Sequence, residues 1–486
     1  MAMKNTSSFL INPYPYYASG IQEDTIYPPV GLLYLAAVLE RNGFSARVLD
    51  ANVLKLSNHE VLKRIKKVKP EIVGISANVV LARAAKELAV MVKKKFPEIF
   101  IVMGGPIVSA LPEDFLAVCD TVVLHEGEET FLELVERYHC QKKRSIFSLF
   151  GSIPGIAFKS KGKIFFTKPR NFINNLDDIP FPAYHLLEPD LGFYSSKSRA
   201  RKIPVAPILT SRGCPFNCIY CNKSIFGHIF RARTPESVFG EIEYLVTKYG
   251  IRQIDILDDN FTLNQARAEK ILDLIIKTKF DLALNCQNGI RADKLTSKLI
   301  KKMKQAGIFK VGIGIESGDP RILKIIKKDL NLKDVRKAIK DFRKIGIIVH
   351  GYFMLGLPGD TEHSMQKTID FAKNVNPQVA NFAIAIPFPG AELYSLIEKK
   401  GKFLVDIRRG ISSGFFGSQV FYEIDEAKKE TVCLFYRKAI REFYFRPQKI
   451  LDIAMSIHSF PEFAWSFRSG LSLILSILKR PKYAFP

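Results

Sequence analysis

Residues 210–221 have the sequence TSRGCPFNCIYC, which begins at the end of an apolar run, Val205–Ser211, that predicts a buried strand. The three cysteines have the spacing C-x3-C-x2-C and share one short loop. Three thiolates so placed can bind three corners of an iron–sulfur cube, and no fourth cysteine lies nearby to fill the last corner. Gly213 and Pro215 suit a backbone that wraps a cluster closely. We therefore predict a [4Fe–4S] cluster with one open iron, whose ligands are Cys214, Cys218 and Cys221.

Two other interpretations of the three cysteines stay open at this point. Structural zinc prefers two separated cysteine pairs, or cysteines together with histidines. This loop has a single triad, and His228 is the only histidine near it. The cysteines could also be buried thiols without a ligand role. The iron–sulfur cluster is the interpretation that we favour.

The cysteine loop opens a series of alternating strand and helix signals. Six such β/α units in a row predict a barrel or partial barrel over residues 203–400. Residues 401–486 turn helical and basic. The predicted strands of the series are Val205–Ser211, Gln253–Leu257, Leu282–Cys286, Lys310–Ile315, Ile347–Met354 and Val379–Ile386.

Residues 1–140 show a similar rhythm of apolar runs separated by helical patterns. Such runs are typical of buried parallel strands, so an N-terminal doubly wound, Rossmann-like sheet is expected. Residues 141–202 lose the rhythm, contain one predicted hairpin around Lys161-Gly162, and are interpreted as a linker. The predicted fold class is therefore α/β, with a doubly wound domain, a linker, a partial (β/α)6 barrel and a helical C-terminal region.

The composition limits the class of protein. Of 486 residues, 47% are hydrophobic, and the formal charge is +24. The lysines are scattered rather than gathered into a stripe with aromatic residues, which disfavours nucleic-acid binding. Seven cysteines, an odd number with three in one loop, do not resemble a disulfide framework. Because no signal-peptide pattern opens the sequence, we expect a cytoplasmic location.

One apolar segment near the C-terminus, Phe463–Leu478, complicates that expectation. It is shorter than a membrane-spanning helix requires, and it contains Arg468. We favour a helix docked on the protein itself. An interfacial helix with peripheral contact to the inner face of the membrane is the alternative.

The motif, its place after the first barrel strand and the six β/α units together resemble the radical S-adenosylmethionine superfamily. The resemblance implies that the open iron chelates S-adenosylmethionine. It also implies that one electron, from a donor such as flavodoxin or ferredoxin, yields methionine and a 5′-deoxyadenosyl radical. Further contacts with S-adenosylmethionine are expected at the carboxyl ends of the strands. The candidates there are Asp258, Asp259, Arg291, Gly312, Gly314, Glu316 and Pro358, with helix capping as the alternative role of the two aspartates.

The first domain, joined to the barrel through Leu176–Pro182, resembles that of the cobalamin-binding subgroup, and the resemblance covers about residues 8–450. Strand ends of an open parallel sheet are where large cofactors bind. An Asp-x-His-x-x-Gly motif is not found here, and Ile107 stands where a histidine would follow Gly-Gly-Pro, so we expect no histidine below the cobalt. The cobalamin candidates are Asn12, Pro13, Ser76, Asn78, Gly104, Gly105, Pro106, Glu126, Gly127 and Glu128.

The resemblance implies a cobalamin-dependent methyltransferase that adds a methyl group to an unactivated carbon of a small-molecule or lipid substrate. A non-methylating rearrangement or oxidative cyclisation, as in the anaerobic porphyrin-ring cyclase of the subgroup, is the alternative within enzymes. A catalytically inactive cobalamin sensor or carrier is the alternative outside them, and the intact cysteine triad argues against it. No catalytic residue is predicted from the protein itself.

Overall fold

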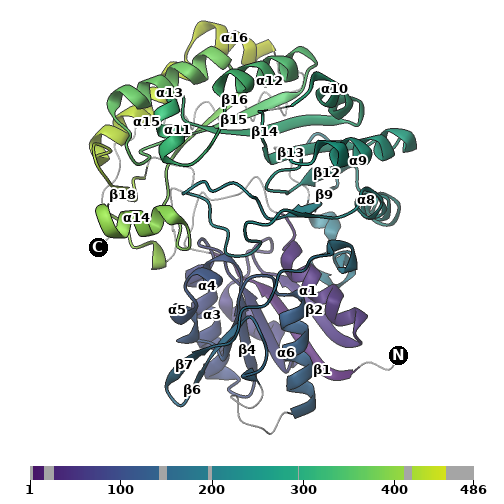
Figure 1. The fold of residues 1–486 in the computed structure, drawn as a ribbon. Coiled ribbons are helices and arrows are strands. Elements are labelled where there is room, and N and C mark those ends of the chain that lie inside the picture. Colours follow the sequence, from purple (N-terminus) through teal and green to yellow (C-terminus); the bar gives the residue numbers. More distant parts are fainter. Residues whose placement is uncertain are drawn as a thin grey trace.

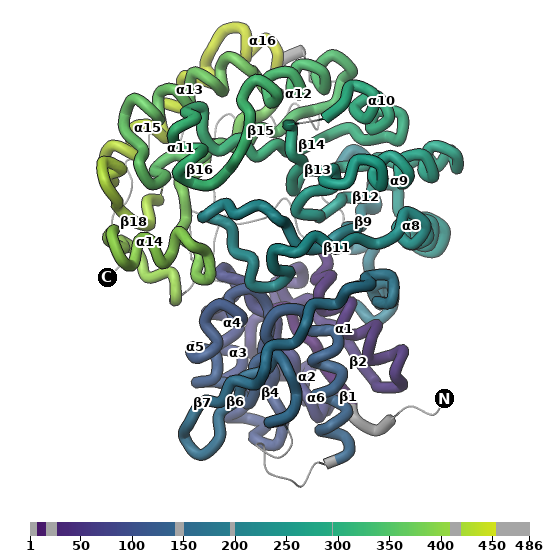
Figure 2. Tube along the Cα trace, viewed as in Figure 1, coloured from purple at the N-terminus to yellow at the C-terminus, as the bar shows by residue number. Residues whose placement is uncertain are grey.

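Two β-sheets with helices around them build the chain, and they lie one above the other in Figure 1. The structure is a computed structural model that describes residues 4–15, 27–141, 150–194, 200–293, 295–409 and 419–455. The lower sheet in the view belongs to the N-terminal part of the chain, and the upper one to the barrel. The segment with the cysteines passes between them, where β11 (Arg231–Ala232) is labelled in Figure 2.

The lower sheet has eight strands in the order β7-β6-β5-β4-β3-β1-β2-β8, and its five central strands are parallel. Separate apolar clusters cover its two faces, one containing Leu33 and Phe131, the other Leu62 and Leu88. Helices on both faces make the sheet doubly wound, as predicted. Its five central strands are β1 (Lys4–Asn12), β2 (Phe44–Asp50), β3 (Ile72–Ser76), β4 (Phe100–Gly104) and β5 (Thr121–Val123), and its main helices are α1 (Val30–Arg41), α2 (Asn58–Val68), α3 (Ala82–Lys95) and α6 (Glu128–Gln141).

The segment that the sequence assigned to a linker contributes three strands to this sheet. The predicted hairpin forms, with β6 (Ile156–Ser160) and β7 (Lys163–Phe166), and β6 pairs antiparallel with β5. A two-residue strand, β8 (Leu187–Glu188), pairs with β2 at the other edge. The hairpin covers an edge that would otherwise present unpaired backbone groups, and it buries apolar side chains of its own. This segment is therefore part of the lower sheet and not a separate linker. Its pairing with the sheet is a long-range contact that the local sequence does not indicate.

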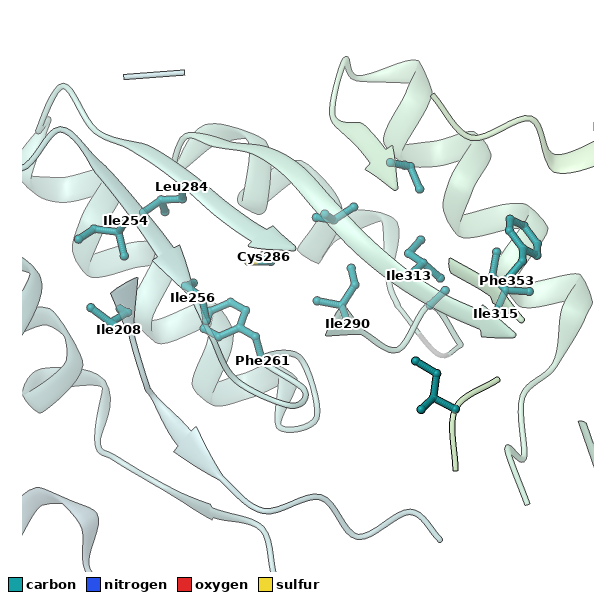
Figure 3. Packing of buried hydrophobic residues seen from close by; sticks show 14 of the residues in the cluster. Ile208, Ile254, Ile256, Phe261, Leu284, Cys286, Ile290, Ile313, Ile315 and Phe353 are labelled. Carbon is teal, nitrogen blue, oxygen red and sulfur yellow. The ribbon is translucent and has the colours of Figure 1, made fainter. Parts of the chain in front are cut away.

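The upper sheet has six parallel strands that follow one another in sequence order, β9-β12-β13-β14-β15-β16. This is the predicted partial (β/α)6 barrel. Side chains of neighbouring strands, such as the register partners Ile254 and Leu284, lie side by side (Figure 3) and are fully buried. The strands are β9 (Val205–Ile208), β12 (Gln253–Ile256), β13 (Ala283–Ile290), β14 (Ile308–Glu316), β15 (Ile348–Leu355) and β16 (Val379–Ile384). The helices between them are α8 (Pro235–Tyr249), α9 (Gln265–Thr278), α10 (Ser297–Gln305), α11 (Pro320–Ile325), α12 (Leu332–Lys344) and α13 (Glu362–Val375), and α14 (Glu392–Lys400) follows the last strand.

The C-terminal region closes the open edge of the barrel. The Tyr444 hydroxyl, at the end of α15 (Lys429–Tyr444), accepts from the Ala380 amide and donates to the Ala380 carbonyl of edge strand β16. A second helix, α16 (Pro447–Met455), follows. Across the described residues, no helix is both long enough and apolar enough to cross a membrane. The apolar segment Phe463–Leu478 lies outside the described residues.

Candidate functional site

The cysteine loop leaves the barrel through a narrow neck. Its two sides, β10 (Ser211–Arg212) and β11, pair antiparallel. Gly213 directly follows β10 with a φ of +80°, and a Cβ there would lie 2.2 Å from the Ile229 carbonyl oxygen on the opposite side. A side chain is therefore excluded both by the backbone conformation and by the close approach of the two sides. The glycine before the first cysteine is required to close the neck.

The middle of the loop is fastened to the mouth of the barrel. The Ile219 amide donates to the Ile326 carbonyl after α11 (3.1 Å), and the Ile219 carbonyl accepts from the Leu393 amide in α14 (2.8 Å). Lys223 Nζ donates to the Cys214 carbonyl (3.0 Å). The positions of Cys214, Cys218 and Cys221 therefore depend on strands and helices more than a hundred residues away in sequence.

The three cysteines are free thiols, Cys221 is exposed, and the other two are partly buried. Burial raises the pKa of Cys214, and the dense surroundings of Cys221 raise its pKa to about 12, with Asp259 as a further cause in both. Among the described residues, no three His, Cys, Asp or Glu side chains converge as one metal ion requires. In an iron–sulfur cube each thiolate binds a different iron, so three separate thiols on one loop fit that group.

Asp258, predicted to contact S-adenosylmethionine, anchors the strand end before the cysteines. Its carboxylate accepts from the Thr210 amide (2.6 Å), the Thr210 hydroxyl (2.5 Å) and the Ser211 hydroxyl (2.5 Å). Asp258 is 1% exposed, and this burial raises the pKa of its carboxyl group. The capping interpretation is wrong, because Asn264 caps α9 by accepting from the Arg267 amide. Asp259 is exposed, close enough to the cysteines to influence their pKa values.

Glu316 lies beside the cysteine loop at the end of β14, with a positive φ of 68°. Its Oε1 accepts from the Tyr220 hydroxyl (3.1 Å) and from Lys328 Nζ (3.0 Å). Its Oε2 is buried and has no hydrogen-bond partner in the protein. Burial alone would lower the pKa of Lys328, but Glu316 outweighs it and raises that pKa. A buried acceptor without a partner next to the cysteines is what a bound ligand with a donor group would satisfy.

Close packing explains why β14 has glycine at positions 312 and 314. A Cβ on Gly312 would lie 2.1 Å from the Gln287 carbonyl oxygen of β13. A Cβ on Gly314 would lie 2.6 Å from Oε1 of Glu316 and 3.0 Å from Lys328 Nζ. Gly314 therefore leaves room for the buried Glu316–Lys328 pair.

The other two predicted contacts lie at strand ends of the same barrel. Arg291 stacks over the ring of Phe216 in the cysteine loop (3.8 Å to the centroid) and pairs with both oxygens of Asp293 (2.8 and 2.7 Å). Burial alone would lower the pKa of Arg291, but Asp293, with a smaller contribution from Cys218, raises it. Pro358 is buried in the turn after β15, where Asp360 accepts from the Leu357 amide (3.0 Å). Arg291 thus belongs to the cysteine loop's surroundings, whereas Pro358 forms part of a closed turn.

The cobalamin candidates of the lower sheet follow the carboxyl ends of its adjacent strands β1, β3, β4 and β5. Several have structural partners. Asn12 donates to Asp50 (2.8 Å), and Asn78 accepts from the Val80 and Leu81 amides before α3. Gly105 has a φ of +109°, and a Cβ there would lie 2.4 Å from the Ala77 carbonyl oxygen. The backbone at this edge is therefore tightly built, and Pro13, Ser76, Gly104 and Pro106 lie along it.

Glu126 and Glu128, predicted to contact cobalamin, form ion pairs with Arg212 and Arg231 at the neck of the cysteine loop instead. Gly127 between them lies against Leu35 of α1. Both carboxylates are therefore paired with arginines of the barrel part of the chain.

The structure adds residues that the sequence did not single out. His125 Nδ1 donates to the Ser224 carbonyl just after the cysteines (2.5 Å), and the Ser224 hydroxyl donates to the Pro106 carbonyl (3.1 Å). The carboxyl edge of the lower sheet therefore faces the cysteine loop. His125 has a φ of 60°, which is uncommon for a residue other than glycine and draws attention to this position. This backbone angle is visible only in the structure, so the sequence contains no signal for His125.

The chain matches two family models. Residues 208–372 match the radical SAM superfamily, and residues 22–135 match the B12 binding domain. An uncharacterized methyltransferase of Pyrococcus horikoshii is 34% identical over 441 residues, which cover 90% of this chain and 92% of the relative. The anaerobic magnesium-protoporphyrin IX monomethyl ester cyclase of Rubrivivax gelatinosus is 26% identical, covering 79% and 69%.

A solved structure has the same fold over the whole length. It is the radical S-adenosylmethionine methyltransferase TsrM from Kitasatospora setae, with cobalamin and a [4Fe–4S] cluster bound. The TM-score is 0.69 at 16% sequence identity, and the alignment covers 99% of this chain and 100% of that one. The likeness shows that both sheets and their arrangement are shared.

Proposed function

The chain belongs to the cobalamin-binding radical S-adenosylmethionine enzymes, and from this we propose that it is a methyltransferase that acts on an unactivated carbon. The observation that carries the proposal is the cysteine loop, which lies between the barrel and the carboxyl edge of the B12-binding sheet. The relative that is 34% identical is named a methyltransferase, which supports methyl transfer as the reaction.

We propose that Cys214, Cys218 and Cys221 hold the cluster and leave one iron open for S-adenosylmethionine. When bound, the cluster and S-adenosylmethionine supply a 5′-deoxyadenosyl radical, and cobalamin supplies a methyl group. The task of the protein is to orient these groups and to exclude water. Asp258 serves that task indirectly, since it fixes the strand end from which the cysteine loop departs.

We propose that Glu316, through its unpartnered Oε2, accepts a hydrogen bond from S-adenosylmethionine. Asp259 and Arg291 follow the ends of β12 and β13, Gly312 and Gly314 lie in the C-terminal half of β14, and together they complete the proposed binding surface. The buried Lys328 holds the Glu316 carboxylate charged and in place. The closeness of Tyr220, which lies between two of the cysteines, supports this placement next to the open iron.

Glu316→Gln is expected to weaken binding of S-adenosylmethionine to the cluster-loaded protein by roughly 10- to 100-fold, the range for a hydrogen bond to a charged group. Equilibrium dialysis measures it. The control is Glu392→Gln, which removes an exposed ion pair with Lys327 beside Lys328 in sequence. Equal affinity of Glu316→Gln and the unmodified protein, at equal iron content, would remove Glu316 from the site.

For cobalamin, we propose the edge formed by Pro13, Ser76, Gly104, Gly105 and Pro106. Small residues and tight turns at this edge allow a large flat ring to approach the backbone. Ile107, at the position where a histidine would stand, is buried in the core. We therefore propose that no histidine ligates the cobalt from below.

The function is tested on anaerobically reconstituted protein with reductant and S-adenosylmethionine. We expect 5′-deoxyadenosine from reductive cleavage and S-adenosylhomocysteine from remethylation of cobalamin. Absence of 5′-deoxyadenosine from cluster-loaded, reduced protein would falsify radical chemistry. Formation of 5′-deoxyadenosine without S-adenosylhomocysteine would instead favour a cyclisation or rearrangement, a reaction class that the 26% identical cyclase supports.

We propose a small-molecule substrate, and within that class a lipid or membrane-adjacent one, on the ground of the net charge of +24 and the apolar segment Phe463–Leu478. A one-electron donor such as flavodoxin or ferredoxin is the partner that the reductive step requires.

A further inference from the structure

The neck of the cysteine loop brings two like charges together. Arg212 of β10 and Arg231 of β11 are direct partners in the antiparallel pair. Directly opposite residues of such a pair have their side chains on the same face of the strands. Two guanidinium groups in this position repel each other unless anions lie between them.

The anions come from the B12-binding sheet. Arg212 Nη1 donates to Oε1 of Glu126 (2.9 Å), and Arg212 Nη2 donates to Oε1 of Glu128 (2.6 Å). Arg231 Nη1 donates to Oε2 of Glu126 (2.7 Å), so Glu126 bridges the two arginines. None of the four side chains is more than 8% exposed. We call these four residues the interdomain ion-pair cluster.

Aromatic rings and backbone groups complete the surroundings of this cluster. The Arg212 guanidinium lies over the rings of Tyr34 in α1 (5.2 Å) and Phe226 in the cysteine loop (5.1 Å). Arg231 also donates to the Ile173 carbonyl (2.7 Å), and Glu126 accepts from the Ile173 amide (2.9 Å). Two positive and two negative charges therefore balance, but only when the two sheets are docked.

We propose that the interdomain ion-pair cluster couples docking of the B12-binding domain to closure of the cysteine-loop neck. Without the two glutamates, the paired arginines would be buried together without a counter-charge, which is costly. With them, the neck closes at a fixed position relative to the carboxyl edge of the lower sheet. The consequence for catalysis rests on the proposed function. In that function, the four residues position the iron–sulfur cluster relative to cobalamin without touching the reacting groups.

The first test is hydrogen–deuterium exchange on the full chain without cofactors, which does not depend on the proposed function. Glu126→Gln weakens both arginine contacts of Glu126 and is expected to speed exchange of the amides of residues 211–232 by roughly tenfold or more through local opening. Glu128→Gln affects one of the three ion pairs and is expected to give a smaller increase in the same segment. If Glu126→Gln does not fold, the exchange rates of Glu128→Gln test the proposed coupling instead.

The matched control is Glu241→Gln, which alters a buried Arg–Glu pair with Arg233 that lies wholly within the barrel part. It is expected to change exchange near α8 and to leave residues 124–130 of the lower sheet at their original rate. The inference is overturned if the variants of Glu126 and Glu128 leave residues 211–232 unchanged. It is equally overturned if Glu241→Gln speeds amide exchange of residues 124–130 as much as Glu126→Gln and Glu128→Gln do.

The second test uses the protein loaded with cluster and cob(II)alamin. Electron paramagnetic resonance reports the magnetic interaction between the reduced cluster and cob(II)alamin, which depends on their separation. Glu126→Gln is expected to bind both groups but to show a weaker or more dispersed interaction, while Glu241→Gln retains it. An unchanged interaction in Glu126→Gln refutes the positioning role. If the unmodified protein makes no 5′-deoxyadenosine, the proposed function fails, but the exchange result still decides the coupling.

Discussion

Replacement of Cys218 by alanine is expected to remove the iron–sulfur cluster and to slow 5′-deoxyadenosine formation by at least roughly a thousandfold, about 4 kcal/mol in the activation barrier. Two thiolates cannot hold the cube in the geometry that leaves one iron open, so S-adenosylmethionine loses its chelation site. Iron content, the visible absorption of the cluster and chromatography of the nucleoside product measure the effect. Cys214→Ala and Cys221→Ala are expected to behave alike.

Cys433→Ala is the matched control, since Cys433 is also a cysteine but is buried in α15 of the C-terminal region. It is expected to retain iron and the rate of product formation. A cluster that forms normally when Cys214, Cys218 and Cys221 are all alanine would refute the ligand assignment, and with it the proposed function.

Gly213→Ala is expected to prevent cluster assembly although it leaves every cysteine in place. The new Cβ would meet the Ile229 carbonyl oxygen at 2.2 Å, and the residue has a φ of +80°. Left-handed backbone costs a non-glycine residue about 1–2 kcal/mol, and overlap in a packed site costs about 1–3 kcal/mol more. The backbone must therefore move just before the first ligand. Iron content after reconstitution and the melting temperature measure the outcome.

Gly250→Ala separates the cost of the left-handed backbone from the cost of the steric overlap. Gly250 ends α8 with a φ of +62°, but a Cβ there would meet nothing within 4 Å. Gly250→Ala therefore has only the conformational cost, about 1–2 kcal/mol of the free energy of unfolding, and is expected to keep its cluster. If both alanine variants lose iron equally, closure of the neck is not what Gly213 provides.

The cluster ligands and the barrel could be predicted from local sequence, because both depend on short-range patterns. The three cysteines lie within eight residues of each other, so their spacing is fixed before the chain folds. The strands of the barrel alternate with helices in sequence order, and most of them are short and rich in apolar residues, as buried parallel strands are. The hairpin β6–β7 was predicted from the sequence, but its place in the lower sheet was not, because pairing of β6 with β5 is a contact between segments that no local pattern encodes.

The roles of the charged residues could not be predicted in this way. Asp258 and Glu126 follow strands and were predicted to contact ligands. In the structure, each buried carboxylate accepts hydrogen bonds from residues that are close in space but distant in sequence. Arg212 and Glu126 are 86 residues apart, and Lys328 reaches back 108 residues to Tyr220. Sequence by itself determined the metal-binding motif and the order of the strands. Only the tertiary structure decided which carboxylates remain for cofactors, since desolvation makes a buried charge costly unless it finds hydrogen-bond donors or a counter-charge across the fold.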